Sequence, residues 1–294
     1  MRSLRGGGNT LTQFEIRDSS IKEGRKDKLV GILYYYERSK RFYAELPTGI
    51  TEWECPMMFM KHVREGVLTI DHISVKKWVE QRIIPHERQN IGAILRDNGL
   101  KEYDEYRLLM LSEGRGAMDD EYIRKIPFDL VPEEIRAREK RRVRDVMAIT
   151  GGKVVVFFAD GRSGMVDPRE FVPAGSPTSF FLGDEERLRR VKVSPGGHGI
   201  EWGSDHFIMA EKLYTHSETL SICYEDVLGF ASDRLISTRR LTRELGASRQ
   251  YISQLVNEGR LSPVIDEPSV RLYPRAQIER DQSGGFVDKT AHNS

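Results

Sequence analysis

Four side chains that can read nucleic-acid bases lie close together near the end of the chain. They are Arg249, Gln250, Ser253 and Gln254. An arginine guanidinium can donate two hydrogen bonds to guanine, and a glutamine amide can form two with adenine in the major groove. Spaced by one, four and five positions, these side chains share one face of a helix. The pattern therefore predicts hydrogen bonding to base edges.

Two short helices are expected to position these side chains. Leu241 and Leu245 lie four residues apart on one face of a first helix. Gly246 can adopt the positive φ of a helix C-terminus, and Ser248 can cap the helix that follows. The second helix has its apolar face at Ile252, Leu255 and Val256. Two helices joined this closely must cross steeply, which leaves the outer face of the second helix free.

From about residue 236 to residue 280 this segment resembles the excisionase-like and MerR-like helix-turn-helix domains. Residues 257–261 are similar to the helix exit of that family, and residues 270–275 to the return strand of its wing. The resemblance implies that Arg260, Arg271 and Arg275 contact the phosphate backbone. Acidic residues at 266 and 267 and a threonine at 242 depart from the family pattern.

Tyr251 and Asn257 flank the base-reading face and are expected to contact phosphates. The complete set of expected DNA-binding residues is Ser248, Arg249, Gln250, Tyr251, Ser253, Gln254, Asn257, Arg260, Arg271 and Arg275. An ordinary helical hairpin with a solvated polar face stays open as the alternative, because arginine, glutamine and serine are common on any exposed helix.

A second resemblance lies in the middle of the chain. A strand over residues 153–158 is followed by the strong hairpin turn Asp160-Gly161, and further strands are expected over residues 188–193 and 199–202. The segment resembles the bacterial domain of unknown function family 2442 at residues 165–167, 181–182, 200–202 and 210–214, and departs from it at Pro168. That family has no established chemistry. Its members tend to accompany toxin-antitoxin and regulatory genes, which implies a binding role.

The first part of the chain predicts an α+β module. Residues 29–36 and 41–46 are rich in β-branched and aromatic side chains, which favours a hairpin across residues 37–40. The later spacing favours helices over residues 56–65, 71–79, 87–100 and 103–111.

The expected fold class is α+β with several domains. We expect an N-terminal α+β module, a small β-rich central module and a C-terminal helix-turn-helix domain with a wing. The expected boundaries are a flexible lead-in at 1–28, the N-terminal module at 29–126, a charged helical connector at 127–142, the β-rich module at 143–216, the helix-turn-helix domain at 217–280 and a flexible tail at 281–294.

Composition limits the classes of function. The formal net charge is only +1, so any attraction to nucleic acid must come from a local patch. Residues 234–280 hold nine arginines and five carboxylates, which gives such a patch. Cys55 and Cys223 form neither a metal motif nor a disulfide framework, and no signal peptide or membrane span is evident. A cytoplasmic location is expected.

Catalysis is not expected. His86 and Glu87 could form a general base with its helper, yet the same pattern is typical of a charged helix start. Asp119, Asp120 and Glu121 lack the spacing of a metal site, and the glycine-rich turn around His198 lacks the features of a phosphate loop. We therefore expect no enzyme, no catalytic residue, no metal and no cofactor.

The sequence thus favours a sequence-specific DNA-binding protein, a transcriptional regulator with antitoxin-like autoregulation. Its expected partner is double-stranded DNA, and no membrane is involved. A homodimer, a protein partner and a small-molecule effector stay open. The alternative function is a protein-interaction or toxin-neutralising module without sequence-specific DNA binding.

Overall fold

The computed structural model describes residues 11–20, 27–172, 175, 179, 182–203, 206–275 and 277. It is a mixed α+β structure whose described strands form four separate antiparallel sheets, as the sequence predicts. The chain divides into two compact units, Met1–Leu220 and Ser221–Ser294. No helix in the described ranges combines the length and the apolar character that crossing a membrane requires.

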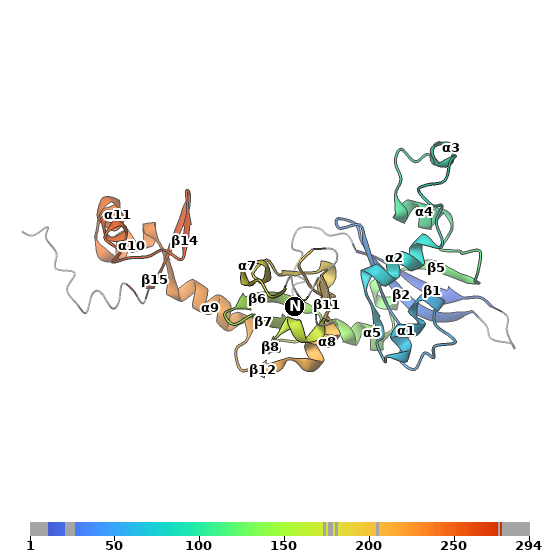
Figure 1. Ribbon diagram of the computed structural model, residues 1–294, viewed down its shortest axis with the longest axis horizontal. Helices are drawn as coiled ribbons and strands as arrows, with labels where there is room; N and C mark the ends of the chain where they lie inside the picture. The colour runs from blue at the N-terminus through green and yellow to red at the C-terminus, as the bar shows by residue number, and fades with distance from the viewer. Residues whose placement is uncertain are drawn as a thin grey trace, which may run out of the picture. The chain divides into compact units, whose positions relative to one another are not determined.

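A five-stranded antiparallel sheet organises the first part of the chain (Figure 1), with the strand order β4-β3-β2-β1-β5. Its strands are β1 (Leu11–Asp18), β2 (Lys28–Tyr36), β3 (Arg41–Glu45), β4 (Thr69–Ile70) and β5 (Glu121–Ile126). The expected hairpin is confirmed, because β2 pairs with β3 across the turn at residues 37–40.

The lead-in expected over residues 1–28 needs correction. Residues 11–18 form β1, which lies between β2 and β5 and pairs with both. Phe14 and Ile16 are buried in the core, so this strand belongs to the module. Residues 1–10 and 21–26, together with the expected tail at 281–294, lie outside the described residues.

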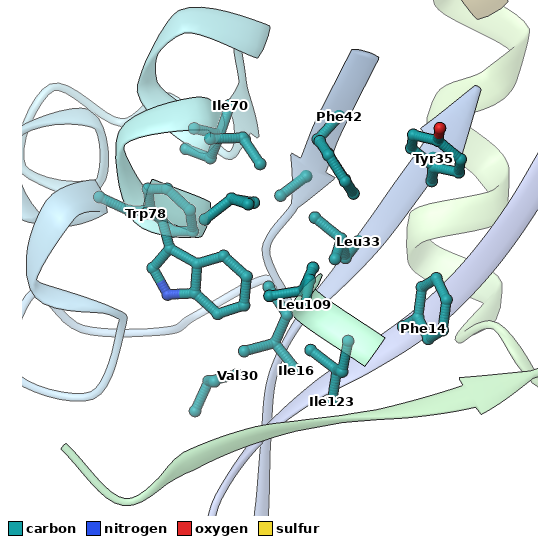
Figure 2. Close-up of a cluster of buried hydrophobic side chains, with 14 of the residues drawn as sticks. Phe14, Ile16, Val30, Leu33, Tyr35, Phe42, Ile70, Trp78, Leu109 and Ile123 are labelled. Carbon is teal, nitrogen blue, oxygen red and sulfur yellow. The ribbon is translucent and has the colours of Figure 1, made fainter. Parts of the chain in front are cut away.

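Helices cover one face of this sheet. They are η1 (Met57–Phe59), α1 (Met60–Arg64), α2 (His72–Glu80), α3 (Ile91–Asp97) and α4 (Glu105–Leu111). Asp71 caps α2 by accepting from the backbone N–H groups of Ile73 and Ser74. Figure 2 shows Trp78 of α2 packed among side chains of the sheet and Leu109 of α4. The helix expected over residues 87–100 is shorter, because turns occupy residues 86–90.

The opposite face of the sheet is also buried. Successive β2 side chains point to opposite faces, so Tyr34 and Tyr36 lie on this second face while Leu33 and Tyr35 enter the first core. Ile135 of α5 (Glu133–Arg138) packs against the second face and is fully buried. The segment at 127–142 is therefore packed against the sheet and is not the simple solvated connector that its charge pattern favours.

The central module contains two small sheets. The four-stranded sheet has the order β12-β8-β7-β6 and the three-stranded sheet the order β11-β10-β9. The elements are β6 (Val143–Ile149), β7 (Lys153–Phe158), β8 (Ser163–Val166), α7 (Glu185–Leu188), β9 (Lys192–Val193), β10 (Gly199–Glu201), β11 (Phe207–Met209), α8 (Ala210–His216) and β12 (Glu218–Leu220).

Two details of this module differ from expectation. The strand expected over residues 188–193 begins only at Lys192, because α7, which Asp184 caps, extends to Leu188 and a turn follows at residues 189–190. The expected end at residue 216 is too early, since β12 pairs with β8 and completes the sheet. The Asp160-Gly161 hairpin turn is present, with Gly161 at a φ of 92°.

The central module packs on the second face of the N-terminal sheet. His198 stacks on Tyr43 with ring centroids 4.1 Å apart, and its Nε2 lies 3.1 Å from the Tyr36 hydroxyl. Arg41 of β3 pairs with Glu201 of β10. These contacts join the two modules into one compact unit.

The second unit has its own core. Its elements are α9 (Tyr224–Arg234), β13 (Leu235–Ser237), α10 (Thr238–Leu245), α11 (Arg249–Asn257), β14 (Ile265–Glu267) and β15 (Val270–Pro274). The three strands pair in the order β13-β15-β14, so β14 and β15 form a hairpin. Its buried core contains Ile236, Leu241, Ile252, Leu255, Leu261 and Tyr273.

Candidate nucleic-acid interface

A tight turn joins α10 and α11, as the sequence predicts. Gly246 has a φ of 62°, the left-handed conformation that ends α10 without strain. Ser248 has extended backbone angles, and its hydroxyl accepts from the backbone N–H of Tyr251 at 3.2 Å. Leu241 of α10 and Ile252 and Leu255 of α11 are buried against each other in the core. The turn and the core together fix the orientation of α11.

The outer face of α11 is exposed. Arg249, Gln250 and Ser253 are exposed, and within the described chain no hydrogen bond or ion pair engages their side chains. Gln254 differs, because its amide donates to the Glu258 carboxylate at 2.7 Å. Asn257 is exposed at the last helical turn, whereas Tyr251 is half-buried. Three of the four expected base-reading side chains are thus available to a partner.

The three arginines that were expected to contact the DNA phosphate backbone form ion pairs with carboxylates of the protein itself. Arg271 of β15 pairs with Asp266 of β14 at 2.5 Å across the hairpin, which gives Asp266 a structural role. Arg260 lies 3.7 Å from the Glu258 carboxylate. Both pairs are exposed and therefore weak.

Arg275 is the most firmly held of the three. Two of its nitrogens donate to the Glu244 carboxylate at 2.9 and 3.0 Å, and its Nε donates to the Asp233 carbonyl at 3.1 Å. These bonds tie β15 to α9 and α10. Arginine at this position therefore has a structural explanation that needs no phosphate.

The sequence reasoning did not single out two further arginines, which lie on the helix that precedes α11. Arg239 and Arg243 are exposed on α10, and within the described residues neither forms an ion pair. They lie four residues apart, on the side of the helix opposite buried Leu241. That spacing was visible in the sequence and could have identified them. Together with Arg249 they supply unpaired positive charge on the α10–α11 pair.

The residues considered for catalysis do not form a site. His86 contacts the ring of Tyr103, and the nearby Arg82 is instead buried with Trp78, Asp119 and Glu121. The described residues contain no cluster of three or more His, Cys, Asp or Glu side chains suited to a metal. Cys55 and Cys223 are both free thiols.

A Ser-His-Asp group does occur in the N-terminal module. The His62 Nε2 lies 3.2 Å from Asp71 and 3.4 Å from the Ser74 hydroxyl. Both partners meet the same ring nitrogen, whereas a catalytic triad requires them on opposite nitrogens. The hydrogen bonds from His62 and Ser74 outweigh burial and lower the pKa of Asp71 to about 2, as befits a helix cap.

Comparison with known proteins identifies the central module. Residues 143–219 match the family model described as "Protein of unknown function (DUF2442)". This segment is a DUF2442 domain. The match confirms the resemblance of this segment to the family, and its end at residue 219 agrees with the inclusion of β12. No curated protein and no solved structure matches the chain.

Proposed function

We propose that the protein is a sequence-specific DNA-binding protein that regulates transcription, with α11 as the helix that enters the major groove. The observation that supports this most is the exposed, unengaged trio Arg249, Gln250 and Ser253 on a helix held by a capped turn. Side chains that must read bases need a rigid element beneath them and no competing intramolecular partner.

Charge supports the same role. The chain carries a net charge of only +1, so DNA affinity has to arise locally. Arg239 and Arg243 on α10 would contact phosphates while Arg249 contacts a base. In helix-turn-helix complexes the first helix crosses the backbone and the second lies in the groove, which matches this division of roles. Autoregulation of the antitoxin type is the physiological form that the DUF2442 resemblance suggests.

Selection from a randomised duplex pool tests the proposal. The full chain, Arg249→Ala and the control Arg190→Ala, which removes an exposed arginine on the DUF2442 domain, are each incubated with the pool at two salt concentrations. We expect a short motif to be enriched by the full chain and by the control, and to be lost with Arg249→Ala. Retention without a motif, weakening steeply with salt, would reduce the role to nonspecific attraction.

A protein-interaction or toxin-neutralising role is the second candidate, and α9 favours it. Leu228 and Phe230 on this helix are exposed, at 49% and 65% of their surface. Exposed apolar side chains of this size favour a protein contact, which includes a second copy of the chain. A homodimer would also place two α11 helices on successive half-sites. Sedimentation with and without DNA distinguishes a dimer from a monomer, and absence of DNA retention would favour this second role.

A further inference from the structure

A cleft lies where α5, the turn at residues 139–141 and α8 meet β3 and β4, within the first unit. Its inner end is a hollow of about 20 Å³, lined by Glu45, Thr69, Arg138, Arg141, Arg142, His198, Ala210 and Glu211. A wider opening of about 320 Å³ shares Arg138, Arg141 and Glu211 with it. Because the two hollows share these walls, they form one cleft with a narrow inner end and a broad mouth.

Two carboxylate oxygens at the inner end have no hydrogen-bond donor. Glu45 is 2% exposed, and its Oε1 accepts from Arg142 at 2.9 Å, while its Oε2 has no donor within the described structure. The Nη1 atom of Arg138 lies 3.9 Å from that oxygen, beyond hydrogen-bond distance. Glu211 of α8 likewise has a buried Oε2 without a donor. A buried carboxylate oxygen without a donor is unfavourable, so both oxygens favour a donor from outside the chain.

His198 adds a third polar group to the same wall. Its ring is fully buried, and burial together with Arg142 lowers its pKa well below the ordinary value, so the ring is neutral. Its Nε2 meets the Tyr36 hydroxyl, whereas its Nδ1 has no partner in the described structure. In the tautomer that donates Nε2–H to Tyr36, the Nδ1 atom of this lining residue is a third acceptor.

The size and charge of the hollow define the group that fits. A volume near 20 Å³ accommodates one group about the size of a water molecule, such as a protonated amine. The charge of Arg142 is balanced by Glu45 and Glu139, and Arg138 donates to the Leu46 carbonyl and the Thr48 hydroxyl. Glu211 forms no ion pair with another described residue, so its carboxylate is available to a cation.

The wider opening of the cleft offers a positively charged donor, Arg141. Arg141 is exposed, and its guanidinium contacts the Tyr214 ring at 5.5 Å without forming an ion pair to any described carboxylate. An arginine in this state can bind a carboxylate through two parallel hydrogen bonds. The cleft thus places acceptors for a cation at its narrow end and a donor for an anion at its entrance.

We propose that this cleft binds a small zwitterion, a free amino acid, with its ammonium group between Glu45 and Glu211 and its carboxylate on Arg141. The ammonium group supplies the donors that the two orphaned carboxylate oxygens lack, and the wider opening holds the side chain. The site contains no residue of α11, so amino-acid binding and DNA binding can be tested independently of each other.

Calorimetric titration of the full chain with each of the twenty proteinogenic L-amino acids tests the proposal. For the tightest binder, the matched amine without a carboxylate and the matched carboxylic acid without an amine are titrated as well. We expect saturable binding of one amino acid or a few related ones, and at least about tenfold weaker binding of each truncated probe, since each lacks a charge-assisted contact.

Variants locate the binding. Glu211→Gln removes the charge of a carboxylate that has no ion-pair partner among the described residues, and Arg141→Gln removes the exposed guanidinium that lines both hollows. Each is expected to weaken binding at least about tenfold, while Glu186→Gln on α7, an exposed carboxylate in an i,i+4 pair, leaves it unchanged. Thermal melting of each variant confirms that it is folded. The proposal is overturned if no amino acid binds saturably, or if binding survives in both Glu211→Gln and Arg141→Gln.

Discussion

At the scale of single residues, the contact between the two modules of the first unit depends on a glycine, Gly196, whose lack of a side chain leaves room for Tyr36. Gly196 has a φ of 68°, and a Cβ added there would lie 1.8 Å from the Tyr36 hydroxyl oxygen. The same loop places His198 between Tyr36 and Tyr43. A glycine that looks like an ordinary turn residue in the sequence is therefore what allows the aromatic rings to approach the loop.

Gly196→Ala is expected to destabilise the first unit more than Gly151→Ala. Both glycines have positive φ, which costs alanine about 1–2 kcal/mol, but a Cβ at Gly151 meets nothing within 4 Å. At Gly196 the clash with Tyr36 adds about 1–3 kcal/mol of overpacking. Denaturant unfolding followed by tryptophan fluorescence measures both losses. Equal losses would show that the loop yields without disturbing Tyr36.

Glu121 predicts a pH dependence of stability. Burial raises its pKa to about 7, against the opposing effects of Arg82 and of the hydrogen bond from the Trp78 indole. Between pH 4.5 and 7 the folded protein holds a proton on Glu121 that the unfolded chain has released. The free energy of unfolding therefore falls as pH rises through this window, by up to about 1.4 kcal/mol per pH unit from this group.

Replacing the carboxyl isolates that contribution. Glu121→Gln keeps an acceptor for the Trp78 indole but cannot titrate, so its stability should vary less with pH between 4.5 and 7 than that of the parent protein. Urea unfolding at half-unit pH intervals gives the two slopes. Parallel slopes would mean that Glu121 stays ionised in the folded protein throughout.

At the scale of elements, helix caps fix the position of the face of α11 that we propose reads bases. Ser248→Ala removes the acceptor for the Tyr251 N–H and should cost α11 about 1 kcal/mol. Ser253→Ala, at an exposed position inside the same helix, should cost nothing, because alanine has the higher helix propensity. Hydrogen exchange of the α11 amides in the full chain measures both changes. Equal changes in the α11 amide exchange rates of the two variants would contradict the capping role of Ser248.

The sequence predicted elements where one local signal dominates. Gly246 and Ser248 identify the α10–α11 turn, and Asp160-Gly161 identifies the β7–β8 hairpin, because each turn depends on the backbone preferences of its own residues. The strand β1 was missed although Phe14 and Ile16 alternate with polar residues. Gln13 and Glu15 are buried on the second face of the sheet, which makes the segment look more polar than its environment.

Long-range pairs could not be predicted in the same way. The Arg142–Glu45 ion pair joins residues 97 positions apart, and Arg275 meets Glu244 across 31 positions. Such partners depend on how sheets and helices pack, which periodicity does not encode. For this reason Arg275 was expected on phosphate, and the cleft at Glu45 and Glu211 was not anticipated.

At the scale of the whole molecule, the two units have separate cores, and within the first unit the central module has its own core but also packs Phe207 and His198 against the N-terminal sheet. A fragment of residues 221–294 is expected to unfold cooperatively, because Ile236, Leu241, Ile252, Leu255 and Tyr273 pack within it. A fragment of residues 143–219 is expected to bind a hydrophobic dye, because Phe207 and His198 lose the sheet that covers them. Calorimetry and dye fluorescence check the two results. A fragment 221–294 without a melting transition would contradict the first, and a dye-silent DUF2442 fragment the second.

The central claim is that Arg249 on α11 reads a base in the major groove. The direct measurement is the binding of the full chain and of Arg249→Ala to the duplex enriched by selection, with each guanine replaced in turn by 7-deazaguanine, which lacks the N7 acceptor. One replacement should weaken binding of the full chain by about 1–3 kcal/mol and leave Arg249→Ala unaffected. The same penalty in both proteins at every position would contradict the claim.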